Sequence, residues 1–163
     1  MKKLSILMAF MLIFTMAAPV FAAPLDKNTT TGSVTVTYEV AESYTVSIPA
    51  SFDFTAESLS NIAEVSASNV LIENGKELNV TMTSANYSDN KYTLNYEGSK
   101  ITYTVKQGET NFTNAGEVLS IASGTTSGSA SLTFATTNDE IAKATKSGAH
   151  TDTLTFTVAV AAQ

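Results

Sequence analysis

SGAHTDTLTFTVAVAAQ, residues 147–163, has the clearest β-strand pattern in this chain. Within it, Leu154, Phe156, Val158 and Val160 alternate with small or polar residues. Strict alternation predicts a β-strand with one buried face, because successive side chains of a strand point to opposite sides. We expect these four apolar side chains to lie in the core.

The same alternation recurs along most of the chain, where Thr, Val, Tyr and Phe fit a pleated, half-buried surface. Residues 65–72 are less regular and predict a bulge. About eight or nine short strands with close turns predict an all-β fold, a single antiparallel β-sandwich. The further apolar runs cover 34–40, 44–48, 65–72, 78–82, 92–96, 101–105, 118–121 and 130–134.

Turn residues lie between these runs. Asn74-Gly75 predicts a hairpin with a type I′ turn, and Gly98-Ser99 predicts a second tight hairpin. A possible short helix is expected near residues 138–146, which open with Asn and two acids and end with a lysine before Gly148.

The first residues have the pattern of a targeting signal. Lys2 and Lys3 precede the apolar stretch 4–18, and small residues at 20 and 22 predict cleavage after Ala22. A retained signal anchor is the alternative, but the apolar run is short for a membrane span. We therefore expect a signal peptide at 1–22, a polar, flexible arm at 23–32, and one sandwich domain at 33–163 without a membrane span.

Composition narrows the classes of partner. The formal net charge is -6, and cleavage after Ala22 makes it -8 because that segment holds two lysines and no acid. The chain contains no arginine and no cysteine. Phosphate binding needs clustered cations, so nucleic acid and anionic lipid are poor candidates. We expect a secreted protein whose core is held without disulfides.

His150 is the only histidine, and Asp152 follows it two residues later. On a strand these two residues share a face, and this is the only feature of the sequence that favours a catalytic triad. The sequence has no G-x-S-x-G motif for a nucleophile and no acidic loop of the calcium-binding type. We interpret His150 as a strand-entry or packing residue and expect no enzyme activity, cofactor or metal.

Aromatic residues raise the question of glycan binding. Most tyrosines are in phase with neighbouring Val, Leu or Ile, so we expect them in the core, whereas Tyr87 lies outside any strand pattern and is a possible surface contact. Lys–Asn isopeptide crosslinks, with Lys91 or Lys106 as candidate lysines, are left open because no local pattern selects a pair.

Two stretches carry a resemblance to known proteins. SYTVSIPASFDF, residues 43–54, resembles a segment of many small secreted Firmicutes surface proteins, and residues 147–160 resemble their usual ending. That ending is also similar to the C-terminal strand of spore-coat-U-like and archaic chaperone–usher pilins. The resemblance implies an immunoglobulin-like sandwich at the cell surface, in fimbriae or in matrix. These families usually have Tyr at the position of His150.

We therefore expect a non-enzymatic surface structural protein, an adhesin, fimbrial or matrix subunit, with a carbohydrate-binding module as the alternative. Expected partners are further copies, other surface proteins, or host or cell-wall glycan. Val34, Val36, Tyr38 and Val40 form a possible inter-subunit strand. Because the link to the next run is short, we expect residues 33–40 to pair within their own domain, with strand exchange between copies as the minority alternative.

Overall fold

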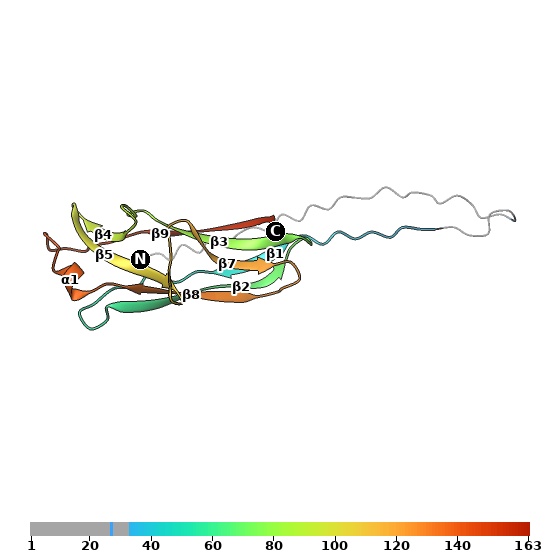
Figure 1. Ribbon diagram of the computed structural model, residues 1–163. Helices are drawn as coiled ribbons and strands as arrows, with labels where there is room; N and C mark the ends of the chain where they lie inside the picture. The colour runs from blue at the N-terminus through green and yellow to red at the C-terminus, as the bar shows by residue number, and fades with distance from the viewer. Residues whose placement is uncertain (1–26, 28–32) are drawn as a thin grey trace, which may run out of the picture. The chain divides into compact units, whose positions relative to one another are not determined.

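The computed structural model describes residue 27 and residues 33–163, and it is an antiparallel β-sandwich (Figure 1). The larger sheet has the order β1-β2-β8-β5-β4, with β6 paired to β5, and the smaller sheet has the order β7-β3-β9. The predicted all-β sandwich of eight or nine strands is confirmed. The strands are β1 (Ser43–Ser47), β2 (Ser60–Leu71), β3 (Lys76–Ser84), β4 (Tyr92–Tyr96), β5 (Ser99–Gln107), β6 (Thr110–Asn111), β7 (Gly116–Ala122), β8 (Gly128–Ala135) and β9 (Leu154–Ala162).

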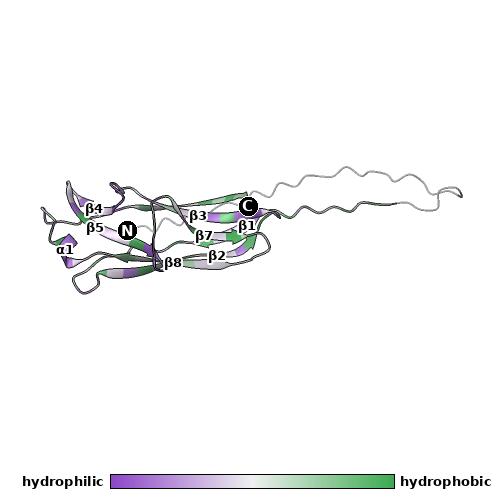
Figure 2. Ribbon diagram, in the orientation of Figure 1, coloured by the Kyte–Doolittle hydropathy of each residue, from purple (hydrophilic) through white to green (hydrophobic). Residues whose placement is uncertain are grey.

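Alternating side chains from the two sheets fill the core. Hydrophobic and hydrophilic residues alternate along the strands (Figure 2), and alternate residues are buried over 78–82 of β3 and 99–105 of β5. Phe134 of β8 lies at the centre, with ring contacts to Phe52 and Tyr103. The fully buried side chains that share this centre are Val65, Leu78, Val80, Met82 and Leu132.

The predicted helix is present but shorter than expected. Helix α1 covers Asn138–Ile141, and Thr137 caps it by accepting a hydrogen bond from the Glu140 amide at 3.2 Å. The helix buries none of its residues, and short helices without a packed face are marginal. The helical conformation therefore does not extend to residue 146.

The two turn predictions have different outcomes. Glu97 and Gly98 both have positive φ and join β4 to β5, as a type I′ hairpin requires, so that hairpin is confirmed. The hairpin predicted at Asn74-Gly75 is wrong. Of these two residues only Gly75 has positive φ, and the turn leads from β2 in the large sheet to β3 in the small one.

The predicted irregularity in residues 65–72 is a bulge in β2. Ser43 pairs with Leu71 and Thr45 with Ser68, so β2 has one residue more than β1 between these two pairs. Asn69 lies within that interval with φ of 54°, a conformation that asparagine tolerates better than most residues.

No strand is assigned to residues 33–42, so the expectation that this segment pairs within its own domain is wrong. The topology gives a reason. Strand β1 begins at the end of the sandwich where β9 finishes, since Ser43 pairs with Leu71 and Lys76 with Ala162. A strand at 34–40 beside β9 of the same chain would have to reverse direction and change sheets within Ala41 and Glu42.

The compact unit that contains all the strands covers residues 40–163. The signal peptide expected at 1–22 lies outside the described residues, as does the arm at 23–32 except for Lys27. In the described part of the chain, no helix has the length and apolar character needed to cross a membrane.

Candidate functional site

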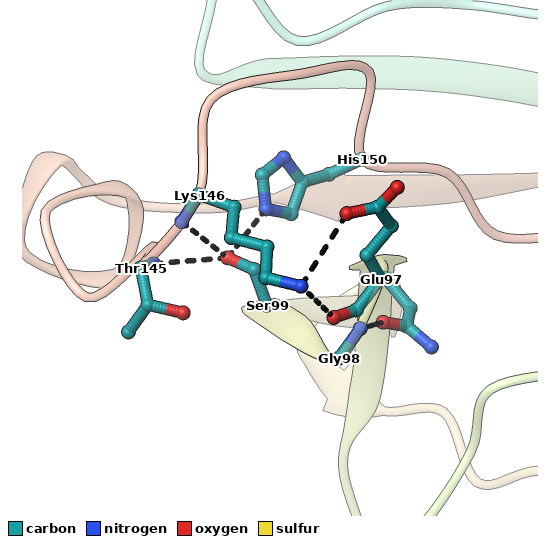
Figure 3. Close-up of polar contacts among 7 residues, drawn as sticks. Glu97, Gly98, Ser99, Thr145, Lys146 and His150 are labelled. Carbon is teal, nitrogen blue, oxygen red and sulfur yellow. Dashed lines mark hydrogen bonds and ion pairs between the residues drawn. The ribbon is translucent and has the colours of Figure 1, made fainter.

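The lone histidine contacts a serine. Nε2 of His150 lies 2.8 Å from Oγ of Ser99, the first residue of β5 (Figure 3). Nδ1 of the same ring lies 3.1 Å from the carbonyl oxygen of Gly148. A serine beside an imidazole is the arrangement that nucleophilic catalysis uses. The surroundings of Ser99 decide whether this pair could act in that way.

The surroundings give Ser99 a structural role. Its Oγ accepts hydrogen bonds from the backbone amides of Thr145 at 2.9 Å and Lys146 at 3.2 Å (Figure 3), and the residue is only 1% exposed. A nucleophile needs a free lone pair and room for substrate, and Ser99 has neither. The ring nitrogen that faces away from Ser99 contacts the carbonyl of Gly148, where a triad would place a carboxylate.

Asp152 makes a separate connection between the two sheets. Its carboxylate accepts hydrogen bonds from the Tyr103 hydroxyl and the Ser84 hydroxyl, both at 2.6 Å, and from the amide of Asn86 at 3.2 Å. Burial, together with this bond to the carboxylate, raises the pKa of Tyr103 well above its usual range. Asp152 therefore links the start of β9 to β5 and β3, and the structure does not pair it with His150.

The tyrosines do not form a shared exposed platform. Tyr92 and Tyr103 are buried with ring centroids 5.4 Å apart, as the sequence pattern predicted. For Tyr38 and Tyr44 the prediction of a core position is wrong, because these side chains are 88% and 42% exposed. Tyr87 is half-buried, packs against Tyr92 at 4.8 Å, and lines an open pocket together with Asn86 and Lys100. Tyr87 is therefore partly accessible, but no neighbouring ring continues its surface.

The most unusual surface in the described structure is the outer edge of β9. This strand pairs with β3 on one side, and its other side has no strand partner among the described residues. It spans nine residues, against five for the edge strand β1, and its apolar side chains alternate as predicted. Long unpaired edges with an apolar face are sites for adding another strand.

The burial of β9 differs from that of its neighbour β3. Leu78, Val80 and Met82 of β3 are all 0% exposed, whereas the residues opposite them, Val160, Val158 and Phe156, are half-buried. Directly opposed residues point to the same face of a sheet, so the two rows contact the same core. The four apolar residues of β9 therefore line the core, as predicted, but are covered on one side only.

A second unpartnered feature precedes β1. Val34, Val36, Tyr38 and Val40 alternate with Thr35, Thr37 and Glu39, and the four apolar side chains are 62–91% exposed. Isolated apolar residues on a surface are common. Four exposed apolar residues in strict alternation are instead typical of a β-strand that has not paired with a sheet. This segment and the apolar row of β9 each contain four apolar residues at a spacing of two.

No metal site was found among the described residues, 27 and 33–163. Nowhere in them do three His, Asp or Glu side chains lie close enough together to hold an ion. Searches of known protein families, curated proteins and solved structures found no match to the chain.

Sequence reasoning identified His150 and Asp152 but missed their partners. Ser99 lies 51 positions from His150, and Ser84 lies 68 positions from Asp152. Ser and Thr occur throughout the chain, so no sequence pattern distinguishes these two serines from the rest.

Proposed function

We propose that this protein is a secreted, non-enzymatic structural protein of the cell surface, an adhesin, fimbrial or matrix subunit, whose copies associate by adding a strand to β9. The observation that carries the proposal is the half-buried apolar row of β9 at an unpaired sheet edge. Residues 34–40 of a second copy are the occupant that fits this edge.

The fit is one of pattern and length. A seven-residue strand is about 20 Å long, so residues 34–40 could cover the part of β9 from 154 to 160. Val34, Val36, Tyr38 and Val40 would then lie over the sandwich interior, beside the half-buried row, and the intervening polar residues would face solvent. Main-chain hydrogen bonds supply affinity in such a complex, and alternate side chains supply specificity.

Burial of apolar side chains and main-chain hydrogen bonds would both stabilise this pairing. Full burial of a Val or Phe-sized side chain contributes about 1.5 to 3 kcal/mol, and both rows gain coverage. Ordering a backbone residue costs about 1 to 2 kcal/mol, so the hydrogen bonds to the edge are needed in addition to burial.

The topology favours a second copy over the same chain as the source of the strand. Glu42 accepts hydrogen bonds from the Glu73 amide and the Lys76 ammonium, both at 3.3 Å, which holds the start of β1 at its end of the sandwich. These contacts lower the pKa of the Glu42 carboxyl. A strand from another copy does not have to reverse direction within residues 41 and 42.

The experiment uses the mature chain, from residue 23 onward, and measures its mass against concentration by light scattering and its form by electron microscopy. We expect oligomers or filaments. The variant V34T/V36T/Y38T/V40T should be monomeric, because it removes the apolar face of the segment. The matched control T35S/T37S alters only the opposite face and should assemble like the wild type.

Crosslinking then identifies the pairing. The natural chain has no cysteine, so Val36→Cys in one copy and Val158→Cys or Phe156→Cys in another report on this contact alone. Disulfides between copies support the proposal. A wild-type protein that stays monomeric at high concentration, or disulfides found only within one chain, would overturn the strand-addition mechanism. Antibody labelling of the native cells tests the location separately, and a purely intracellular signal would contradict it.

The alternative, a carbohydrate-binding module, has less support. Such a module needs exposed, roughly coplanar rings, and burial removes Tyr92 and Tyr103 from any surface. Tyr87 contributes one half-buried ring to an open pocket.

A further inference from the structure

The hydrogen bonds around Ser99 determine where the protons lie. A serine hydroxyl has one hydrogen to donate and two lone pairs. Both lone pairs of Ser99 receive backbone N–H groups, from Thr145 and Lys146, so its hydrogen is left for Nε2 of His150. The carbonyl of Gly148 can only accept, so Nδ1 carries the proton of the ring. The arrangement thus requires a neutral imidazole protonated at Nδ1.

An imidazolium cannot replace the neutral ring in this arrangement. Protonation would put an N–H on Nε2, facing an oxygen whose lone pairs are already used. Ser99 is buried, so its hydroxyl hydrogen cannot simply turn toward solvent. This unfavourable contact is removed only if His150 moves away from Ser99 or if the amides of Thr145 and Lys146 no longer donate to Ser99.

The charged groups around His150 do not remove this conflict. The ammonium of Lys146 is held by the carbonyl and carboxylate of Glu97, at 2.8 and 3.3 Å, on the β4–β5 turn (Figure 3). The carboxylate of Asp152 is occupied by the hydroxyls of Tyr103 and Ser84. Lys100, on β5, is exposed.

The segment that carries His150 also covers an edge of the large sheet. The residue after it, Thr151, exchanges two backbone hydrogen bonds with Asn95 of β4, at 2.9 and 3.1 Å. Tyr96 of the same strand lies beside Gly148 and His150, with the two rings 5.7 Å apart. An edge strand covered in this way is protected from pairing with other chains.

We infer that Ser99, Thr145, Lys146 and His150 form a pH-sensitive clasp, which is closed when His150 is neutral and opens when it is protonated. Histidine is the side chain whose charge ordinarily changes between about pH 5 and pH 8. Opening frees residues 145–151 from the β4–β5 hairpin and uncovers the edge of β4, while the rest of the sandwich stays folded. The inference does not depend on strand addition at β9.

The test is amide hydrogen exchange of the mature chain, measured by NMR from about pH 8 to pH 5 and corrected for the intrinsic pH dependence of exchange. Protection at Thr145, Lys146 and Thr151 should fall by up to about tenfold for each pH unit as the pH decreases toward 5. Protection at Val80, a central residue of β3, should stay constant. Equal protection of the clasp amides at both ends of the range would overturn the inference.

Two variants and one direct observation complete the test. His150→Gln cannot be protonated in this range, so its clasp amides should lose their pH dependence; an unchanged decrease would assign the effect to carboxylates and overturn the inference. Ser99→Ala should leave the clasp open at every pH. The nitrogen shifts of the single imidazole identify its tautomer in the wild-type protein, and a ring protonated at Nε2 at neutral pH would also contradict the inference.

Discussion

Val80 and Val158 face each other across β3 and β9 and point to the same face of the sheet, yet Val80 is fully buried and Val158 is only half-buried. The difference arises because β3 has a strand on each side, whereas β9 has a strand partner on one side only within the described residues. The stability of a single copy and the association of copies should therefore depend on different residues of the same sheet.

Met82→Ala and Phe156→Ala form a matched pair that separates these two quantities, since the residues are cross-strand partners. Met82→Ala should lower the free energy of unfolding by about 2 to 5 kcal/mol, as for other fully buried residues. Truncation of a buried Phe usually costs about 3 to 5 kcal/mol, and Phe156→Ala should destabilise the monomer by less than this. It should weaken association more than Met82→Ala does. Urea unfolding at low concentration and light scattering measure the two effects. Equal unfolding costs with unchanged association would contradict the role assigned to β9.

Two neighbouring tyrosines should respond in opposite ways to loss of the hydroxyl. The Tyr92 hydroxyl is buried and has no hydrogen-bond partner among the described residues, whereas the Tyr103 hydroxyl donates to Asp152 at 2.6 Å. An unsatisfied buried polar group costs about 1 to 3 kcal/mol, so Tyr92→Phe should be neutral or stabilising. Tyr103→Phe should destabilise because it leaves Asp152 with one donor fewer. Chemical unfolding of both variants checks this contrast, and a destabilised Tyr92→Phe would show that its hydroxyl has a partner.

The same rings predict a loss of stability in alkali. Burial raises the pKa of Tyr92 from 10.0 to about 12, with Tyr87 and Asp152 adding to the effect. Because the unfolded chain loses this proton first, the contribution is fully present below about pH 10 and is lost as the pH rises toward 12. Tyr92→Phe should reduce the decrease in alkaline unfolding titrations, and an unaltered pH profile would contradict the assignment.

Gly148 is required for a close approach as well as for its backbone conformation. A Cβ at this position would clash with Cε1 of Tyr96, and φ is 151°. Gly124, with φ of 87° and open space around it, is the matched control, because alanine there meets only the backbone cost. Gly148→Ala should lower the free energy of unfolding more than Gly124→Ala does. The loss for Gly124→Ala should be about 1 kcal/mol, which is typical of such changes. Thermal unfolding compares them, and equal costs would show that Tyr96 moves aside freely.

Several features of the fold could be predicted from local sequence because local chemistry controls them. Period-two alternation located most strands, and a hairpin at Gly98-Ser99 was predicted from glycine's tolerance of positive φ. The turn itself lies one residue earlier, at Glu97 and Gly98. The error at Asn74-Gly75 has a physical cause. A turn signal reports that the chain reverses, but whether the flanking strands pair depends on side-chain burial across the whole domain.

A closing strand with one apolar face follows from the alternation of Leu154, Phe156, Val158 and Val160, because side-chain direction along a strand is a local property. The order of the strands in the folded chain placed this strand at a sheet edge, where it is half-covered. Tertiary packing also brought His150 to Ser99 rather than to Asp152, because hydrogen bonds between distant residues exist only once the sheets are packed.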